Sequence, residues 1–274
     1  MRTIAIANHK GGCGKTTTAV SLSAAFVGLG FRVLLIDLDP QAHATLGLGH
    51  KCHNRPHTIY EVLTQPNMPL QHAVLKTKLK NLDVVPSNMM LGAAELDLRG
   101  IMGKELILGA KLGALEENYD LCLIDCAPNA SLLMVNAVVA STDVLVPVQA
   151  HYYAIQGLRQ MIETVRILRK RFNPCSVSVL GLALTFVDDR TLLSKRVQRG
   201  MRQYFGDLVF DTVIHSTISL AEAPSRGESI FAYAPESRGA IEYRALALEA
   251  MGRLRERTTE IASRSHTQPG QVAV

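Results

Sequence analysis

The sequence predicts an α/β protein with a single domain, in which a mostly parallel, twisted sheet carries helices on both faces. Short runs rich in leucine and β-branched residues alternate with helical patterns, as is typical of parallel sheets. The short runs are apolar throughout, which is expected of strands buried on both faces. A glycine-rich loop also joins the first apolar run to a helical pattern. We expect the domain to cover residues 1–262 and a disordered tail to cover residues 263–274.

The apolar runs define the strands in chain order. The expected strands are Thr3–Ala7, Arg32–Asp37, Leu82–Pro86, Leu121–Asp125, Val144–Val148, Ser178–Phe186 and Leu208–Ile214. Segments with apolar residues at helical spacing lie between them. The expected helices are Lys15–Leu29, Asn88–Arg99, Lys104–Asn118, Leu132–Ala140, Ile155–Phe172, Leu192–Phe205 and Ala240–Ile261. Helical crossovers of this kind allow consecutive strands to run parallel in one sheet.

Composition narrows the class of protein before any motif is considered. The 274 residues suit one large α/β domain, and 47% apolar residues are enough for a deep core. The net charge of +5 permits a polyanionic partner without requiring one. No apolar stretch approaches roughly 18 residues and Met1-Arg2 leads directly into a strand, so we expect neither a membrane span nor a signal peptide. Five scattered cysteines favour a reduced cytoplasm.

Residues 9–17 read His-Lys-Gly-Gly-Cys-Gly-Lys-Thr-Thr and directly follow the first apolar run. In such a loop the glycines let backbone N–H groups surround phosphate oxygens, Lys15 reaches the β- and γ-phosphates, and the Thr16 hydroxyl can hold Mg²⁺. A chance glycine-rich turn is the alternative, but strand, loop and helix all fall in register. His9 stands where a glycine is usual, and a second lysine, Lys10, opens the loop. The residues expected to bind nucleotide here are Lys10, Gly11, Gly12, Cys13, Gly14, Lys15, Thr16 and Thr17.

Carboxylates follow two of the expected strands. Asp37 and Asp39 lie at the end of the second strand, and Asp125 ends the fourth. Open α/β sheets bind ligands at the carboxyl ends of their strands, so we expect these groups beside the phosphate loop. Helix capping or turn formation could explain one aspartate of the first pair, but two favour metal and water handling. An apolar strand that ends in an aspartate also matches the Walker B arrangement, whose carboxylate holds Mg²⁺ directly or through water.

Together these motifs resemble one family. The loop Lys-Gly-Gly-x-Gly-Lys-Thr-Thr, the run Asp-x-Asp-Pro-Gln at residues 37–41 and the run Asp-x-x-Pro at residues 125–128 are similar to those of the ParA/Soj partition ATPases. That family belongs to the wider MinD/ParA group of P-loop ATPases with a deviant Walker A loop. Val146–Ala154 and Ala221–Ser225 resemble two further stretches of the family. The resemblance runs from about residue 2 to residue 250.

The resemblance implies an ATPase that closes into a homodimer when ATP and Mg²⁺ are bound. Lys10 matches the signature lysine that reaches across the interface to the partner's phosphates. Asp39 matches the carboxylate that orients the attacking water, and Asp125 matches the metal-binding carboxylate. The implied catalytic residues are Lys10, Lys15 and Asp39, and the implied metal-binding residues are Thr16, Asp125 and Asp39. A lysine at the loop entrance points away from its own phosphate cradle, which agrees with a role in trans.

The resemblance also places the purine. Residues 214–220 align with a common family run, Ile-Pro-Arg-Asn-Val-Arg-Leu, whose proline and asparagine lie near the base. His215 and Thr217 occupy those two positions, so we expect them to contact the purine. Ser216 and Ser219 stand where the family run has arginines, and this difference weakens any DNA contact implied there.

The segment 190–205 indicates a nucleic-acid partner. It contains no acid and five bases, which are Arg190, Lys195, Arg196, Arg199 and Arg202. At helical spacing an apolar face, made of Leu193, Val197, Met201, Tyr204 and Phe205, lies opposite a cationic stripe made of Lys195, Arg199 and Arg202. Such a helix suits contact with phosphates of double-stranded DNA without base reading. A solvated helix face is the alternative, which remains equally open for the second cluster, residues 169–171.

Other functions were weighed against this one. A MinD-type membrane-surface ATPase would need an amphipathic end, but residues 263–274 have no apolar face and contain Pro-Gly. A nucleotide-dependent reductase would need cluster-binding cysteines, and packing is the simpler role for Cys122 and Cys126. A histidine- and cysteine-rich loop at residues 43–57 matches no standard zinc spacing. The resemblance further implies a stimulating partner, ParB-like or a cargo adaptor, and a cytoplasmic, nucleoid-associated location. The cargo, whether chromosome, plasmid or protein organelle, stays open.

Overall fold

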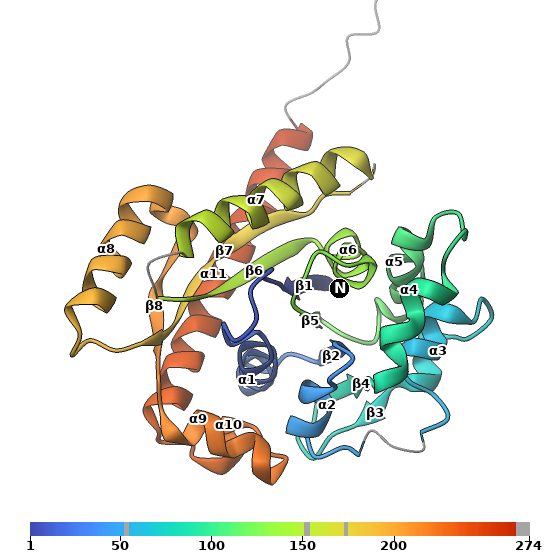
Figure 1. Ribbon diagram of the computed structural model, residues 1–274, viewed down its shortest axis with the longest axis horizontal. Coiled ribbons are helices and arrows are strands. Elements are labelled where there is room, and N and C mark those ends of the chain that lie inside the picture. Colours follow the sequence, from blue (N-terminus) through green and yellow to red (C-terminus); the bar gives the residue numbers. More distant parts are fainter. Residues whose placement is uncertain (52–54, 151–153, 173–174, 267–274) are drawn as a thin grey trace, which may run out of the picture.

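The computed structural model describes residues 1–51, 55–150, 154–172 and 175–266 (Figure 1). These residues form one sheet with the strand order β3-β4-β2-β5-β1-β6-β7-β8. All neighbouring strands pair in parallel, except that β3 is antiparallel to β4. The predicted fold class is therefore confirmed.

The seven expected strands are all present, and each of their ends lies within one residue of the expected position. The strands are β1 (Arg2–Ile6), β2 (Val33–Leu38), β3 (Leu75–Lys76), β4 (Leu82–Val85), β5 (Leu121–Cys126), β6 (Asp143–Gln149), β7 (Ser178–Val187) and β8 (Val209–His215). The additional strand, β3, is two residues long, so it is too short to show a periodic pattern.

The longer helices agree with the sequence pattern, whereas the short ones do not. The α-helices are α1 (Lys15–Gly28), α2 (His43–Gly47), α3 (Ile59–Thr64), α4 (Ala94–Asp97), α5 (Ile107–Leu112), α6 (Leu132–Val139), α7 (Ala154–Arg171), α8 (Leu192–Phe205), α9 (Ile218–Glu222), α10 (Ile230–Tyr233) and α11 (Arg238–His266). Helix α3 was missed although Thr58 and Glu61 form a capping box in front of it, a pattern that the sequence displays. Helix α11 extends to His266, past the expected start of the tail, and residues 267–274 lie outside the described residues.

Two expected helices, Asn88–Arg99 and Lys104–Asn118, are broken into short pieces. Only α4 and α5 remain α-helical there, and turns of 3-10 helix flank them. The first expected helix contains Gly92 and the second contains Gly109 and Gly113, while Gly100 and Gly103, with φ of 83° and 72°, separate the two. Glycine is a poor helix former, so a segment with several glycines does not sustain a continuous helix.

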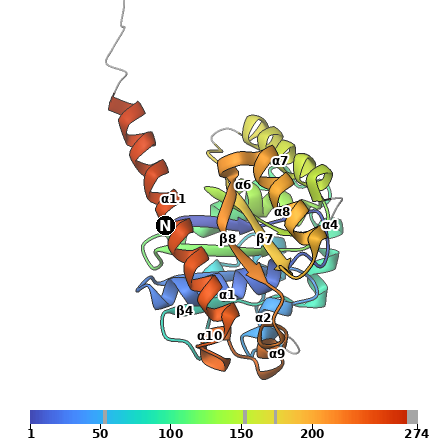
Figure 2. The same ribbon diagram turned by 90° about the vertical axis from the view of Figure 1, so that its left-hand side faces the viewer.

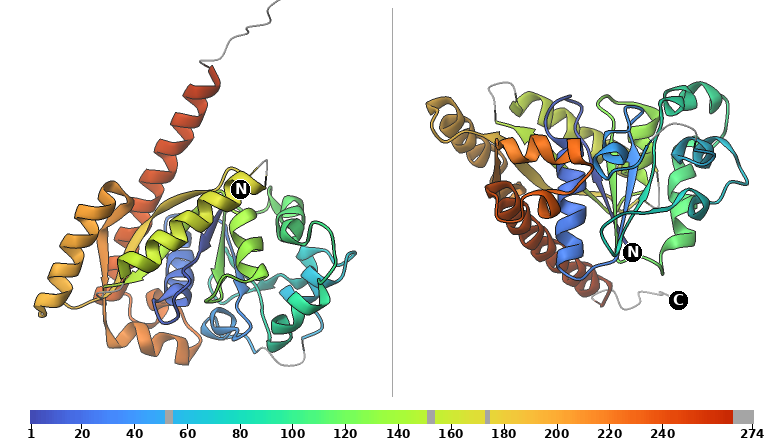
Figure 3. Two further views of the ribbon diagram at one scale, coloured as in Figure 1. Left: turned by 45° about the horizontal axis from the view of Figure 1, so that its top comes forward. Right: turned by 90° about the horizontal axis from the view of Figure 1, so that it is seen from below.

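Two apolar layers cover the sheet (Figures 2 and 3). Ile4 and Ile6 of β1 belong to the layer under α1, α2 and α11, whereas Ala5 and Ala7 belong to the layer under α3 to α8. This alternation places a helix layer on each face, as expected for a parallel sheet. The loops that follow β1, β2, β5 and β7 consequently lie at one edge, where the strands end.

Candidate nucleotide-binding site

The glycine-rich loop has the backbone shape of a phosphate cradle. Gly12 and Gly14 adopt φ of 71° and 84°, a left-handed conformation that glycine tolerates best. Gly14 directly precedes α1, so the positive end of the helix dipole faces the loop. Lys15 is buried, and its Nζ donates a hydrogen bond to the carbonyl of Lys10 at 2.8 Å. The loop is thus closed on itself by the lysine expected to bind phosphate.

Neighbouring strands hold this loop in place. The Asn8 side chain donates to the Pro147 carbonyl at 2.7 Å and accepts from the Lys10 amide at 3.1 Å. The Thr185 hydroxyl of β7 donates to the Cys13 carbonyl at 2.9 Å. The Cys13 thiol is buried and donates to the Lys10 carbonyl, so Cys13 packs the loop from inside. These hydrogen bonds attach the loop to the ends of β6 and β7.

Asp125 is a buried carboxylate without a regular partner. It lies beside Ile6 of β1 and Asp37 of β2 in the sheet register. Neither carboxylate oxygen has a hydrogen-bond partner of regular geometry among the described residues. Burial, followed by the charge of Asp37, raises the pKa of Asp125 well above its usual range, while the Thr16 hydroxyl and Lys15 act in the opposite direction. A cation bound in front of Asp125 would satisfy both oxygens, so these residues fit Mg²⁺.

The two aspartates at the end of β2 have different roles. Asp37 is fully buried and accepts from the Thr45 hydroxyl at 2.6 Å and the Thr45 amide at 2.7 Å. Burial raises the pKa of Asp37 to about 6. The Thr45 hydroxyl in turn accepts from the Ser87 amide at 3.0 Å. Asp37 therefore joins β2 to α2 and to the end of β4, which is the structural role that the sequence left open for one aspartate.

Asp39 lines the cavity in front of the loop instead. Its Oδ1 accepts from the Gln41 amide at 2.9 Å, which fixes the carboxylate at the cavity wall. The cavity has a volume of about 610 Å³. It is lined by Gly11, Gly12, Gly14, Lys15, Thr16, Thr17, Asp39, Pro40, Gln41, His43, Ala127, Pro128, Asn129 and Phe186. Lys10 is exposed beside this loop, and its Nζ has no hydrogen bond or ion pair within the described part of the chain.

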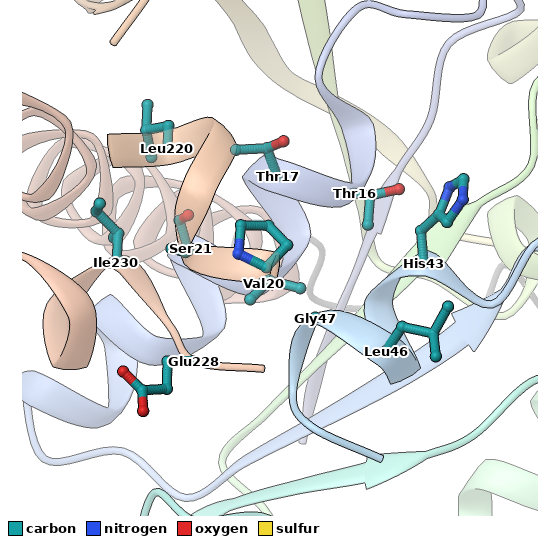
Figure 4. A pocket seen from close by; sticks show the side chains of 12 residues that line it. Thr16, Thr17, Val20, Ser21, His43, Leu46, Gly47, Leu220, Glu228 and Ile230 are labelled. Carbon is teal, nitrogen blue, oxygen red and sulfur yellow. The ribbon is translucent and has the colours of Figure 1, made fainter. Parts of the chain in front are cut away.

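A smaller apolar cavity of about 280 Å³ adjoins the first (Figure 4). It lies between α1, α2 and the segment from α9 to α10, and Val20, Leu46, Leu220 and Ile230 contribute its apolar wall. Thr16, Thr17 and His43 line both cavities, so the two spaces meet at the start of α1.

The two residues expected at the purine lie outside both cavities. The His215 ring is buried, with Nδ1 at 2.6 Å from Glu242 Oε1 and Nε2 at 2.7 Å from Asp189 Oδ2. Both ring nitrogens are therefore occupied by carboxylates and are not free to contact a base. Thr217 precedes α9 and accepts a hydrogen bond from Ser219 at 3.4 Å. Sequence alignment could not detect these contacts, because Glu242 and Asp189 lie more than twenty residues away in the chain.

The five cations expected at DNA also divide into two groups. Arg190 forms two bonds of 2.9 Å with Asp188, and Arg202 donates to the Phe210 carbonyl at 3.1 Å and to the Asp211 carbonyl at 3.1 Å. The others, Lys195, Arg196 and Arg199, are exposed and have no side-chain partner within the described ranges. Three cations are thus available without rearrangement.

The apolar face expected on α8 is only partly buried. Met201 is buried, but Leu193 is 55% exposed and Tyr204 is 49% exposed. The Arg159 guanidinium of α7 covers the Tyr204 ring at 4.4 Å. Helix α8 lies at the outer end of the sheet, over β7 and β8, so it has core contacts along a narrow line (Figure 1).

Known proteins agree with this geometry. A family model described as an AAA domain matches residues 1–176. The sporulation initiation inhibitor protein Soj of Bacillus subtilis is 43% identical over 246 residues, which are 90% of this chain and 96% of Soj. The chromosome partitioning protein ParA of Caulobacter vibrioides is 39% identical over 264 residues, 96% of this chain and 98% of that protein. A solved structure of cobyrinic acid a,c-diamide synthase from Mycobacterium smegmatis, with ADP and magnesium, has a TM-score of 0.78, 33% identity and coverage of 90% and 92%.

The fold and the cavity define a P-loop ATPase with a deviant Walker A loop, whose cofactors are ATP and Mg²⁺. The chain belongs to the AAA domain family that its first 176 residues match. Within it, the chain is a partition ATPase of the ParA/Soj type.

Proposed function

We propose that the protein is an ATP-dependent dimerising switch that binds DNA without sequence preference and positions a cargo. The observation that carries this proposal is the free side chain of Lys10 beside the phosphate cavity. The Lys10 carbonyl accepts from Lys15 and Cys13 inside the loop, so its side chain extends outward. A cation in that position acts on the phosphates of a second subunit, in the manner of an arginine finger.

The hydrolytic step follows from the residues around the cavity. Lys15 exchanges the Lys10 carbonyl for phosphate oxygens when nucleotide enters. The Thr16 hydroxyl and Asp125 would hold Mg²⁺, directly or through water, and the bound metal would supply positive charge to the phosphates. Asp39 orients the attacking water, because its carboxylate lines the cavity, whereas the Asp37 carboxylate is bound to Thr45 of α2. Hydrolysis is slow until a partner protein, ParB-like or a cargo adaptor, completes the site.

DNA binding depends on the dimer. One subunit offers Lys195, Arg196 and Arg199 as available cations, and two subunits double that number on one particle. Because each neutralised phosphate contributes about −0.9 to the salt slope, doubling three contacts steepens the slope by about three units. ATP would therefore increase affinity for any duplex and retain the protein on the nucleoid. The name of one relative, a chromosome partitioning protein, supports a chromosome as cargo, and a plasmid or a protein organelle are the other cargoes that this proposal includes.

The test compares wild type, Lys10→Ala and Asp39→Ala, with Lys80→Ala as a control lysine that is exposed near the opposite edge of the sheet. Mass is measured by light scattering with ATP and with ADP, together with hydrolysis and binding to two unrelated duplexes. We expect Lys10→Ala to remain monomeric with ATP, and Asp39→Ala to dimerise and bind DNA but hydrolyse roughly 100-fold more slowly. Dimerisation of Lys10→Ala at the ATP concentration that dimerises the wild-type protein would contradict the proposed role in trans.

The same samples test the alternative of membrane-surface attachment. Among the described residues, no helix has the length and apolar character needed to cross a bilayer. A surface-bound helix would instead give ATP-dependent sedimentation with anionic lipid vesicles. Sedimentation with vesicles and equal DNA binding in ATP and ADP would favour the MinD-type function over the DNA-based one.

A further inference from the structure

The order of the strands fixes the direction of a bound nucleotide. Asp39 follows β2 and Asp125 ends β5, and both strands lie on one side of β1 and its phosphate loop. A metal held by Asp125 would contact the terminal phosphates, so the γ-phosphate would lie on the side of β2 and β5. The nucleoside must then leave the loop on the other side, where β6, β7 and β8 end.

Phe186, next to the last residue of β7, stands on that side. It has a φ of 52°, which places a bulky residue in the left-handed region. Its side chain is 44% exposed and lines the cavity in front of the loop. The Phe186 ring also lies against the loop, 3.3 Å from the position that a Cβ on Gly14 would occupy. An exposed aromatic ring in a strained backbone is unfavourable by itself, so its retention at a cavity wall points to a ligand.

Other candidates for contact with the base are absent from this wall. The two ring nitrogens of His215 are held by Glu242 and Asp189, and Thr217 lines neither cavity. His43 lies after β2, on the metal side. Among the residues that line the larger cavity, Phe186 is the one aromatic side chain from the β7 side.

We infer that Phe186 is the residue on which the purine of ATP stacks. The phosphates lie in the glycine loop while the exposed face of the Phe186 ring covers the base. Thr185 supports this arrangement, because its hydrogen bond to the Cys13 carbonyl ties the end of β7 to the loop. The inference rests on the assignment of the loop and of Asp125 to phosphate and metal.

The first test separates the base from the phosphates. Affinities for Mg-ATP and for Mg-tripolyphosphate are measured by calorimetry for wild type, Phe186→Ala and Phe186→Tyr, with Leu193→Ala as an exposed apolar control. We expect Phe186→Ala to weaken ATP by roughly 10- to 100-fold and to leave tripolyphosphate unchanged, because stacking concerns the base alone. Phe186→Tyr should retain ATP affinity. An equal loss for both ligands would mean that Phe186 only packs against the loop, and that outcome would overturn the inference.

The second test reports stacking directly. The chain contains no tryptophan, so Phe186→Trp introduces a single fluorophore at the cavity wall. Mg-ATP should quench its emission and Mg-tripolyphosphate should not, whereas Leu193→Trp should respond to neither. An unchanged Phe186→Trp spectrum with saturating ATP would refute stacking. Failure of tripolyphosphate to bind wild type would instead refute the assignment of the loop itself.

Discussion

The phosphate loop and helix α8 are both cationic segments that the sequence singles out, and the folded chain uses their charges differently. In the loop, the Lys10 side chain has no partner within the described ranges, and the Lys15 ammonium binds the Lys10 carbonyl and lies 4.0 Å from the Cys13 sulfur. In α8, Arg202 is attached to the backbone of β8, while Lys195 and Arg199 stay free. Both segments therefore keep part of their charge available, and in α8 it is Arg202 that is bound to a neighbouring strand.

Arg202 is bound to β8 because this strand forms an exposed edge of the sheet. β8 is the last strand, so its outer backbone groups need partners other than a strand. Glu249 accepts from the Asp211 and Thr212 amides at 2.8 and 2.9 Å, and Arg202 donates to the Phe210 and Asp211 carbonyls. These side chains cap the edge and prevent its pairing with another chain. A cationic side chain on a helix therefore indicates an interface only if it is not already bound to the unpaired backbone groups of a neighbouring edge strand.

Removing the Lys15 ammonium should have a stronger effect on ATP binding than removing the Lys10 ammonium. Lys15→Ala removes charge-assisted hydrogen bonds to phosphate and should weaken ATP by about 100-fold or more. Lys10→Ala should change ATP affinity of the monomer by less than about threefold, because its side chain lies outside its own cradle. Calorimetry with Mg-ATP measures both. Equal losses in the two variants would show that Lys10 and Lys15 act on the same nucleotide.

Substitutions in α8 should separate the cations that contact DNA from the one that stabilises the fold. Replacing both Lys195 and Arg199 by alanine removes about four phosphate contacts per dimer and should reduce the salt slope by about 3 to 4. Arg202→Ala should leave the slope unchanged and lower the free energy of unfolding by about 1–2 kcal/mol, because two carbonyls of β8 lose their donor. DNA titrations across a salt series and urea denaturation provide the measurements. A reduced salt slope in Arg202→Ala would show that Arg202 also contacts DNA.

A third prediction concerns the pH dependence of stability that the buried Asp37 carboxyl causes. The pKa of Asp37 is raised to about 6 in the folded protein, so protonated Asp37 favours the folded state. This contribution is complete below about pH 4 and is lost as the pH rises to about 6. It should amount to about 3 kcal/mol. Urea denaturation without nucleotide or metal, compared between wild type and Asp37→Asn, isolates it. A constant difference between the two proteins from pH 4 to pH 7 would exclude it.

The sequence alone determined the features that depend on local chemistry. Glycines at positions 12 and 14, followed by a helix, can form a cradle whatever surrounds them, and the structure retains that shape. Alternating apolar runs and helical patterns fixed the parallel sheet, because strands of that kind are stable only when both faces are covered. Asp39 and Asp125 were located at strand ends for the same reason, since parallel strands all end at one edge.

Only the tertiary structure decided which side chains remained free to act. Asp37 and Asp39 are two residues apart, yet Thr45 binds one of them and leaves the other at the cavity. His215 is held by Glu242 from α11, and Arg202 is held by the edge of β8. These partners come from elements that are distant in the sequence, so no local sequence pattern predicts the contacts. A sequence specifies the polar groups that a segment carries, but burial and the nearest neighbour decide whether each group is satisfied within the fold or left for a ligand.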